Sequence, residues 1–337
     1  MREAMFWKKE KGAVKCGLCY RNCVIPEGKY GFCRVRKNEK NTLYAATYGR
    51  ACAAFVDPIE KKPFYHFHPG ENAFSIATAG CNFRCLHCCN PEISQSGPGV
   101  VPEMDLPPER VVSAARDYFT NIIAYTYTEP TVFYEYAHDA GVIARKQKML
   151  NVFVTNGYAQ TPVIKNAAKD FLDAARIDLK GDEEHYKRVC GNVELENVLK
   201  CIRDYYKTRM HIEIITLVIP GDNDNRAFVS RMASFIKGLG RNGKNIPWHF
   251  IRFFPSYKMM STPATPVETL VKMRDWAKDE GMNYAYTGNM PGHEYDNTYC
   301  HNCGTLLVRR SGFGVAENFL KKDAKCPECR AKIPVVL

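Results

Sequence analysis

The amino-acid sequence predicts an α/β fold: a partial (β/α)6 parallel barrel with small cysteine-rich metal-binding modules at both ends. Strand-like runs alternate with helix-like stretches through the middle of the chain, which is typical of a parallel sheet with helical crossovers. Most of the 15 cysteines fall into three groups along the 337 residues. Six strand–helix units are fewer than the eight of a closed barrel, so we expect an open one.

The predicted strands are short, apolar runs at 74–79, 122–126, 152–155, 175–179, 212–219 and 248–253. The predicted helices cover 108–119, 131–148, 162–172, 196–207, 226–240 and 266–280, and several carry a proline within the first turn, a favourable helix start. In such folds the loops that follow the carboxyl ends of the strands carry the chemistry. Functional side chains are therefore expected at that edge of the sheet.

The cysteine groups and the length predict three domains, because one hydrophobic core seldom exceeds roughly 250–300 residues. We expect a four-cysteine metal-binding segment at 1–70, the barrel at 71–292 and a zinc-ribbon or rubredoxin-like module at 293–337. Cys52, Cys190 and Cys201 stand apart and are interpreted as small buried hydrophobic residues.

Composition indicates a globular protein, with 45 % apolar and 25 % charged residues. No run approaches the roughly 18 apolar residues of a membrane span, and the first residues lack the apolar core of a signal peptide. We therefore expect a cytoplasmic protein without membrane association. Disulfides are rare in that compartment, so clustered cysteines indicate bound metal.

The formal net charge of +11 would suit a nucleic acid or an acidic protein partner. Thiolates change this balance: two four-cysteine zinc sites and one iron–sulfur cluster lower it to roughly +6. No block of five like charges occurs. The charge therefore favours a docking surface for an acidic protein over a groove for RNA.

Cys81, Cys85 and Cys88 follow the first predicted strand with the spacing C-x3-C-x2-C. Three thiolates in one loop can hold three corners of a four-iron cluster and leave the fourth iron open to a ligand. A zinc knuckle is the alternative, but it needs a fourth ligand and none is obvious nearby. Cys89 adjoins Cys88, so both can hardly point at one cluster.

This loop resembles the signature of the radical S-adenosylmethionine (SAM) superfamily. The resemblance extends to its glycyl-radical (pyruvate formate-lyase) activating branch, and most closely to the radical SAM enzymes of the AmmeMemoRadiSam system. It covers nearly the whole chain. The supporting motifs are Cys-Asn-Phe-Arg-Cys at 81–85, Tyr-Thr-Glu-Pro at 127–130, Thr-Asn-Gly at 155–157, Asp-Leu-Lys at 178–180, Val-Ile-Pro-Gly at 218–221 and a longer run at 248–259.

The resemblance implies an oxidoreductase-type enzyme with a [4Fe-4S] cluster that cleaves SAM reductively. The resulting 5′-deoxyadenosyl radical abstracts hydrogen from an unidentified substrate, either a small molecule or a protein side chain. An alternative is an activase that installs a glycyl radical on a partner enzyme. The implied partners are a low-potential electron donor of the ferredoxin or flavodoxin type and a protein substrate or the other proteins of the named system.

The resemblance also assigns roles to individual residues. Cys81, Cys85 and Cys88 become the cluster ligands and catalytic residues, Glu129 accepts bonds from the SAM amino group, and Lys180 lies near the SAM carboxylate. The full cofactor-binding set is His87, Asn90, Tyr127, Thr128, Glu129, Asn156, Asp178, Lys180, His249 and Arg252.

Several of these residues have plainer interpretations. Asp178 and Lys180 point the same way on a strand and could form a simple ion pair. His249 could be a core histidine, and Asn156 with the following glycine is a turn signal in any protein.

The terminal cysteines predict two further metal sites. The pairs C-x2-C at Cys300 and Cys303 and at Cys326 and Cys329 are typical of a zinc ribbon, with rubredoxin-like iron as the alternative. At the other end, Cys16, Cys19, Cys23 and Cys33 form a four-thiolate set for which zinc is favoured over an iron–sulfur cluster.

A function from another class also accounts for the cysteines and the charge: a non-catalytic iron–sulfur and zinc scaffold that transfers electrons or binds RNA. It predicts a cluster with four protein ligands and no response to SAM. It leaves Glu129, Asp178 and Lys180 at strand ends unexplained.

Overall fold

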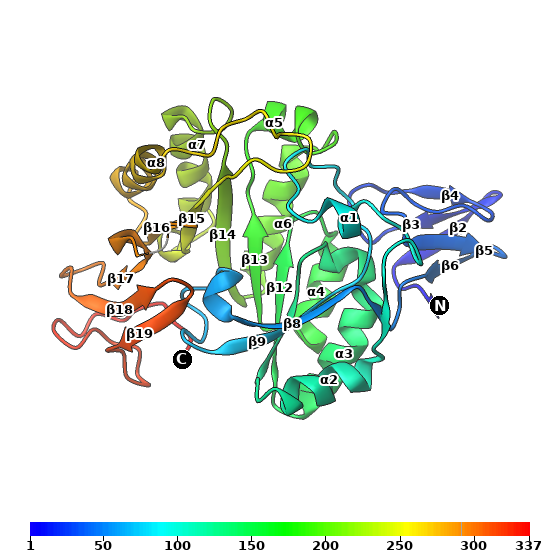
Figure 1. Ribbon diagram of the computed structural model, residues 1–337, viewed down its shortest axis with the longest axis horizontal. Helices are drawn as coiled ribbons and strands as arrows, with labels where there is room; N and C mark the ends of the chain where they lie inside the picture. The colour runs from blue at the N-terminus through cyan, green and yellow to red at the C-terminus, as the bar shows by residue number, and fades with distance from the viewer. Residues whose placement is uncertain (291) are drawn as a thin grey trace.

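A computed structural model describes residues 1–290 and 292–337, and an eight-stranded sheet forms its centre (Figure 1). The sheet order is β16-β15-β14-β13-β12-β11-β9-β8, so its two edges are not joined. Seven strands are parallel: β9 (Asn72–Ala77), β11 (Ile122–Tyr125), β12 (Leu150–Thr155), β13 (Ala174–Asp178), β14 (His211–Val218), β15 (Trp248–Arg252) and β16 (Ala285–Gly288).

The predicted α/β class and open parallel barrel are confirmed, and all six predicted strands are present. The sequence interpretation missed two edge strands. β16 is a seventh parallel strand, and β8 (Ala53–Pro58) pairs antiparallel with β9. Most residues of the inner strands are buried, and in β11 every residue is buried. Continuous burial without alternation is expected where a parallel sheet is covered on both faces.

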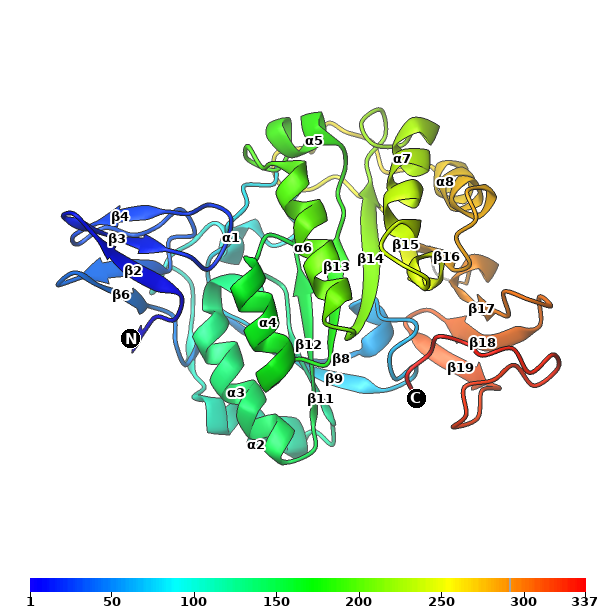
Figure 2. The same cartoon turned by 180° about the vertical axis from the view of Figure 1, so that it is seen from behind.

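Helices cover the outer face of the sheet (Figure 2). Their starts follow local chemistry: proline occupies the first turn of α1, α2 and α4, and Asp182 and Asn225 accept backbone N–H bonds as N-caps of α5 and α7. The bounds are α1 Pro91–Ser94, α2 Pro108–Asp117, α3 Tyr134–Lys146, α4 Thr161–Asp170, α5 Glu183–Arg188, α6 Leu195–Lys207, α7 Arg226–Lys237 and α8 Val267–Asp279.

The predicted helix at 131–148 is divided in two. A 3-10 turn, η2 (Pro130–Phe133), precedes α3 because the Glu129 carboxylate accepts the Thr131 N–H and caps the turn at 3.0 Å. The remaining short 3-10 turns are η1 (Ile59–Lys61), η3 (Gly243–Asn245) and η4 (Glu294–Asp296).

The N-terminal segment forms two small antiparallel sheets at one side of the barrel (Figure 1). A buried ion pair attaches them: Arg36, 1 % exposed, donates to Glu135 of α3, which is 2 % exposed, with one N···O distance of 2.7 Å. The strands are β1 (Arg2–Glu3), β6 (Thr42–Ala45) and β5 (Arg36–Glu39) in one sheet, and β2 (Trp7–Glu10), β3 (Ala13–Cys16) and β4 (Val24–Pro26) in the other; β7 (Arg50–Ala51) pairs with β10 (Met104–Asp105).

The C-terminal segment forms a three-stranded sheet at the opposite side, from β17 (Thr298–Tyr299), β18 (Leu306–Ser311) and β19 (Gly314–Asn318). It packs against the stretch before β9: Arg310 donates to the Tyr65 carbonyl at 2.7 Å, and Val336 bridges to Phe67. His66 lies buried at this junction, where its Nε2 is 2.6 Å from the Tyr286 hydroxyl.

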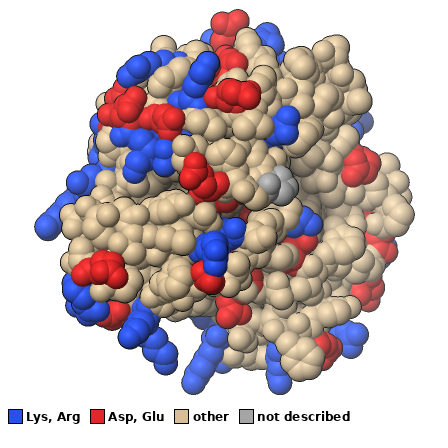
Figure 3. All heavy atoms as spheres, turned by 60° about the vertical axis from the view of Figure 1, so that its left-hand side comes forward, with Lys and Arg blue, Asp and Glu red and all other residues tan. Residues whose placement is uncertain are grey.

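The surface carries charges of both signs. On the face shown in Figure 3, Lys and Arg side chains are interspersed with Asp and Glu and do not gather into one continuous basic patch. None of the helices in the described ranges combines the length and apolar character that crossing a bilayer requires.

Candidate active site

The triad Cys81, Cys85 and Cys88 lies in the loop after β9, at the carboxyl edge of the sheet, as predicted for this edge. Backbone bonds fix this loop from two sides. Arg84 and Leu86 donate to the carbonyls of Cys190 and Val189, at 3.1 and 2.9 Å. From the loop that follows β15, the Ser256 hydroxyl donates to the Cys88 carbonyl at 2.8 Å and the Lys258 amide to the Leu86 carbonyl at 2.9 Å.

Gly80 brings this loop against the N-terminal module. Its φ is +98°, and a Cβ at this position would lie 2.6 Å from Val35 Cγ1 and 2.7 Å from the Cys33 carbonyl oxygen. A residue with a side chain would be strained in this conformation and would also overlap its neighbours. Glycine is therefore required directly before the first cysteine of the triad.

The three triad sulfurs lie too far apart for one ion to bond all of them at these positions. Among the described residues, the four C-terminal cysteines have sulfurs that all lie within 4.8 Å of one another. The three sulfurs of this triad do not. Burial raises the pKa of the Cys81 and Cys88 thiols, so isolated thiolates are unfavourable here. A bound cation that stabilises the thiolates reverses that preference.

Asn156, at the end of β12, faces the same loop. Its Nδ2 donates to Asn82 Oδ1 at 2.7 Å and lies 3.8 Å from the Cys81 sulfur. Its Oδ1 is buried with no hydrogen-bond partner among the described residues. Unsatisfied buried polar atoms are costly, so this oxygen is a free acceptor beside the triad.

Glu129 lies between the ends of β11 and β12 and is 1 % exposed. Its Oε1 accepts from Thr131 and from the Thr155 hydroxyl at 2.8 Å, whereas Oε2 accepts from the Asn156 amide at 2.8 Å. Burial raises the pKa of Glu129, and these donors oppose the rise. Since a carboxylate oxygen accepts two bonds, Oε2 has room for one more donor.

Tyr127 and Thr128 are tied to the protein rather than directed at a common point. Tyr127 has a φ of +61°, and its hydroxyl donates to Asp57. The Thr128 hydroxyl donates to the Thr78 carbonyl at 2.8 Å. Asn90 donates to the Tyr127 carbonyl at 2.9 Å, which joins the cysteine loop to the end of β11.

Asp178 ends β13 between two cations. Lys180 Nζ lies 2.6 Å from its Oδ2, and Arg176 donates to its Oδ1. Burial lowers the pKa of Arg176 to about 10. Burial also acts to lower the pKa of Lys180, but the nearby Cys85 thiol group, when ionised, raises it above its usual range. The plainer interpretation, an ion pair between Asp178 and Lys180, is therefore confirmed, and the pair lies at the carboxyl end of β13.

Cys190 is fully buried, as expected from the sequence, but its contact with the cysteine loop was not predicted. The loop after α5 places its sulfur within 4.8 Å of the Cys85 sulfur and a His87 ring nitrogen. His87 is buried, its Nε2 has no partner within the described ranges, and burial lowers the pKa of its ring well below the usual value. A lone cysteine after a short helix carries no sequence signal for this contact.

His249 and Arg252, the two residues of the cofactor-binding set that lie on β15, occupy different parts of the strand. His249 is the second residue of the strand, not near its end: it is fully buried, bonds Glu213 at 2.7 Å and stacks on Tyr286. This placement corrects the expectation that His249 lies at the carboxyl edge. Arg252 does end the strand, and its Nε donates to the Thr265 carbonyl at 2.8 Å.

The C-terminal cysteines form a compact set. The sulfurs of Cys300 and Cys329 are 3.6 Å apart, as are those of Cys303 and Cys326, and all four lie within 4.8 Å of one another. Tetrahedral zinc with Zn–S bonds of about 2.3 Å separates its sulfurs by roughly 3.8 Å. The set therefore has the dimensions of a single-ion site.

The residues at the carboxyl edge fit a [4Fe-4S] cluster and SAM. Three thiols in one loop match a cluster with one open iron, and the unpartnered Asn156 Oδ1 and His87 Nε2 are polar atoms with unused bonding capacity beside it. Glu129 Oε2 offers an acceptor for an ammonium group, and Lys180 offers a donor for a carboxylate.

Comparison with known proteins agrees with this geometry. Residues 75–229 match the model of the radical SAM superfamily, so this part of the chain is a radical SAM domain. Over its full length the chain is 44 % identical, across 339 residues and 100 % of both chains, to the uncharacterized protein MJ0808 of Methanocaldococcus jannaschii. The two proteins belong to the same family.

Solved structures are similar to this chain at low sequence identity. SuiB of Streptococcus suis bound to S-adenosylmethionine is 13 % identical, with a TM-score of 0.50 over 68 % of this chain and 53 % of its own. A domain of the pyruvate-formate lyase-activating enzyme of Bacteroides vulgatus is 20 % identical, with a TM-score of 0.43 over 49 % of this chain and 98 % of its own.

Proposed function

We propose that the protein is a radical SAM enzyme in which Cys81, Cys85 and Cys88 hold a [4Fe-4S] cluster at the carboxyl edge of the barrel. The observation that supports this most strongly is the position of Asn156. Its side-chain Nδ2 lies 3.8 Å from the Cys81 sulfur, and its backbone N–H donates to Glu129 Oε2. A cluster held there would supply one electron for the reductive cleavage of SAM, which would be the source of a 5′-deoxyadenosyl radical for hydrogen abstraction.

The chain's own residues bind and orient SAM. Glu129 Oε2 accepts a bond from the amino group, and its position is fixed by the Asn156 amide. Lys180 faces the carboxylate, and its Nζ is held in place by Asp178 at 2.6 Å. The loops around this site are shaped by His87, Asn90, Tyr127, Thr128 and Arg252. His249 lies away from the site, in its buried pair with Glu213.

For the substrate we favour a protein or peptide side chain. Phe254, Tyr257 and Met260 are exposed on the loop that bonds the cysteine loop through Lys258. Exposed apolar side chains that adjoin a reactive site suit a peptide segment better than a small polar molecule. The activating-enzyme branch and the AmmeMemoRadiSam system remain our proposals for its relatives, with glycyl-radical installation as the alternative reaction.

We further propose that a ferredoxin- or flavodoxin-type protein reduces the enzyme in the cytoplasm, and that the C-terminal cysteines bind structural zinc. The 3.6 Å sulfur separations support a single tetrahedral ion at this site. The three-part division at residues 70 and 292 stays a proposal; β8 precedes the first boundary yet pairs with β9.

The test is anaerobic reconstitution with iron and sulfide, reduction with dithionite, addition of SAM and assay of 5′-deoxyadenosine. We expect product from the wild-type chain and none from Cys85→Ala. Cys201→Ala is the matched control, because this buried cysteine of α6 lies outside the triad loop. Absence of wild-type product, with a cluster spectrum that SAM does not change, would instead favour the electron-transfer or RNA-binding scaffold.

A further inference from the structure

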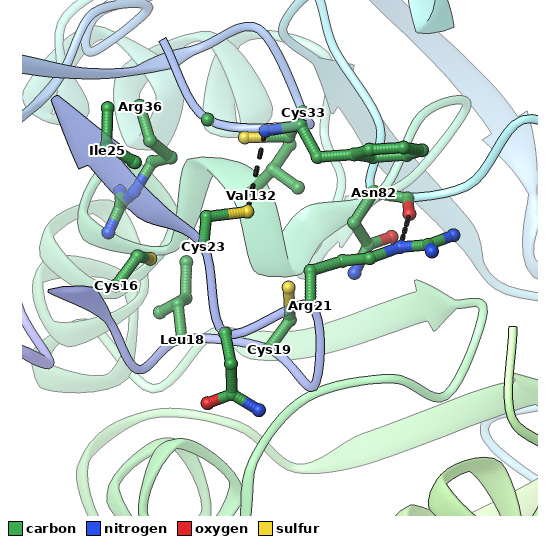
Figure 4. A pocket seen from close by; sticks show the side chains of 13 residues that line it. Cys16, Leu18, Cys19, Arg21, Cys23, Ile25, Cys33, Arg36, Asn82 and Val132 are labelled. Carbon is green, nitrogen blue, oxygen red and sulfur yellow. Dashed lines mark hydrogen bonds between the residues drawn. The ribbon is translucent and has the colours of Figure 1, made fainter. Parts of the chain in front are cut away.

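The four N-terminal cysteines line one cavity although they come from separate turns. Cys16 ends β3, Cys19 and Cys23 lie in the turn that follows, and Cys33 lies in the loop before β5. The cavity holds about 330 Å³ of atom-free space, part of it open to solvent. Figure 4 shows the four side chains arranged around it.

The sulfur spacing separates this site from the C-terminal one. No three of the four N-terminal sulfurs lie within 4.8 Å of one another, although all four residues are among those described, whereas the C-terminal four do. A single zinc ion needs sulfurs roughly 3.8 Å apart. A four-iron cluster places irons and sulfides between its ligands and so needs thiols that are farther apart. The sulfurs of Cys81, Cys85 and Cys88 likewise do not all lie within 4.8 Å of one another.

Two unpartnered donors line the same cavity. Arg36 is 1 % exposed and Asn82 is fully buried, and Arg36 Nε and Asn82 Nδ2 have no hydrogen-bond partner among the described residues. Sulfides and thiolates of an iron–sulfur cluster accept N–H bonds, and a cluster with four thiolates is anionic. Arg21, a third lining residue, adds a further positive charge.

We propose that Cys16, Cys19, Cys23 and Cys33 ligate a second [4Fe-4S] cluster, not the zinc ion favoured by the sequence interpretation. All four corners have protein ligands, so this cluster has no site for SAM and serves as a one-electron carrier.

Its position suits transfer to the first cluster. Asn82 lines the cavity, and its Oδ1 accepts from Asn156, which approaches the Cys81 sulfur. Arg21 Nε also donates to the Asn82 carbonyl at 2.9 Å. The second cluster accepts one electron from a reduced ferredoxin- or flavodoxin-type donor and passes it to the first. This carrier role rests on the proposed function, whereas the site itself does not.

The test counts metal in the full-length chain after anaerobic reconstitution. We expect about eight irons and one zinc per wild-type chain, and about four irons with an unchanged zinc count in the Cys81→Ala/Cys85→Ala/Cys88→Ala variant. The residual iron should show the absorption and, when reduced, the EPR signal of a [4Fe-4S] cluster. Four irons and two zincs in the wild type, with no iron in the triad variant, would overturn the proposal.

A second variant keeps the result independent of how well the triad variant folds. Cys16→Ser/Cys19→Ser should lose about half of the wild-type iron and keep the SAM-dependent change in the remaining cluster spectrum. Unchanged iron in this variant would count against the second cluster. A wild-type chain with eight irons but no 5′-deoxyadenosine would refute the proposed function alone.

Discussion

Gly80→Ala tests whether the close contact between the cysteine loop and the N-terminal module determines stability. The added methyl would enter a residue with φ of +98° and would lie 2.6 Å from Val35 Cγ1 and 2.7 Å from the Cys33 carbonyl oxygen. Left-handed backbone costs a side-chain-bearing residue about 1–2 kcal/mol. Overpacking costs about 1–3 kcal/mol more, because the carbonyl belongs to the backbone and yields little. The expected loss of unfolding free energy is therefore about 2–5 kcal/mol.

Gly28→Ala separates the two contributions. Gly28 also has positive φ, +71°, but a Cβ there would meet nothing within 4 Å. This control should lose about 1–2 kcal/mol, the backbone cost alone.

Equilibrium urea unfolding under anaerobic conditions measures both variants, and iron analysis adds a second readout. We expect Gly80→Ala to retain less iron than Gly28→Ala. The added methyl forces residue 80 away from the N-terminal module, and Cys81, the next residue, moves with it. Equal stability and equal iron in the two variants would refute the argument that this contact positions the loop.

Three further outcomes follow from buried groups. Arg36→Met should lower the free energy of unfolding in urea by about 3–5 kcal/mol, because it leaves the Glu135 carboxylate buried and without a counter-charge. The double variant Arg36→Met/Glu135→Leu should recover part of that loss. A single variant as stable as the wild type would contradict this reasoning. Burial lowers the pKa of His66 to about 3 from a usual 6.5, so the unfolded chain binds the extra proton and stability should fall as pH drops from 6.5 towards 3, by up to about 1.4 kcal/mol per pH unit. His66→Gln should flatten that slope in pH-dependent unfolding, and an unchanged slope would count against the assignment. Cys303→Ser should lower zinc content without changing iron, and loss of iron instead would contradict a separate zinc site.

The cysteine spacings and the strand-end motifs were readable from the sequence because they are local. C-x3-C-x2-C after a buried strand requires only that one loop carry three thiols, and the parallel alternation of strands and helices places that loop at the carboxyl edge. Pro, Asp and Asn helix starts were equally local. The edge strand β16 escaped prediction because it has only four residues, Ala285–Gly288, and its two end residues, Ala and Gly, are depleted in strands.

Contacts between distant segments were not readable from the sequence. Cys190 approaches Cys85 because the loop after α5 bonds the cysteine loop, and His249 sits in a buried pair with Glu213 because the two residues lie on neighbouring strands. Neither contact follows from residue type.

The sequence by itself determined the barrel, the triad and the two terminal cysteine sets, because periodicity and short-range spacing encode them. Only the tertiary structure distinguished the two terminal sets. Both consist of four cysteines, but the fold draws the C-terminal sulfurs to 3.6 Å in pairs and leaves the N-terminal ones around a cavity with unpartnered Arg36 and Asn82 donors. Distances between thiols depend on how separate turns pack, and a spacing pattern in the sequence does not contain them.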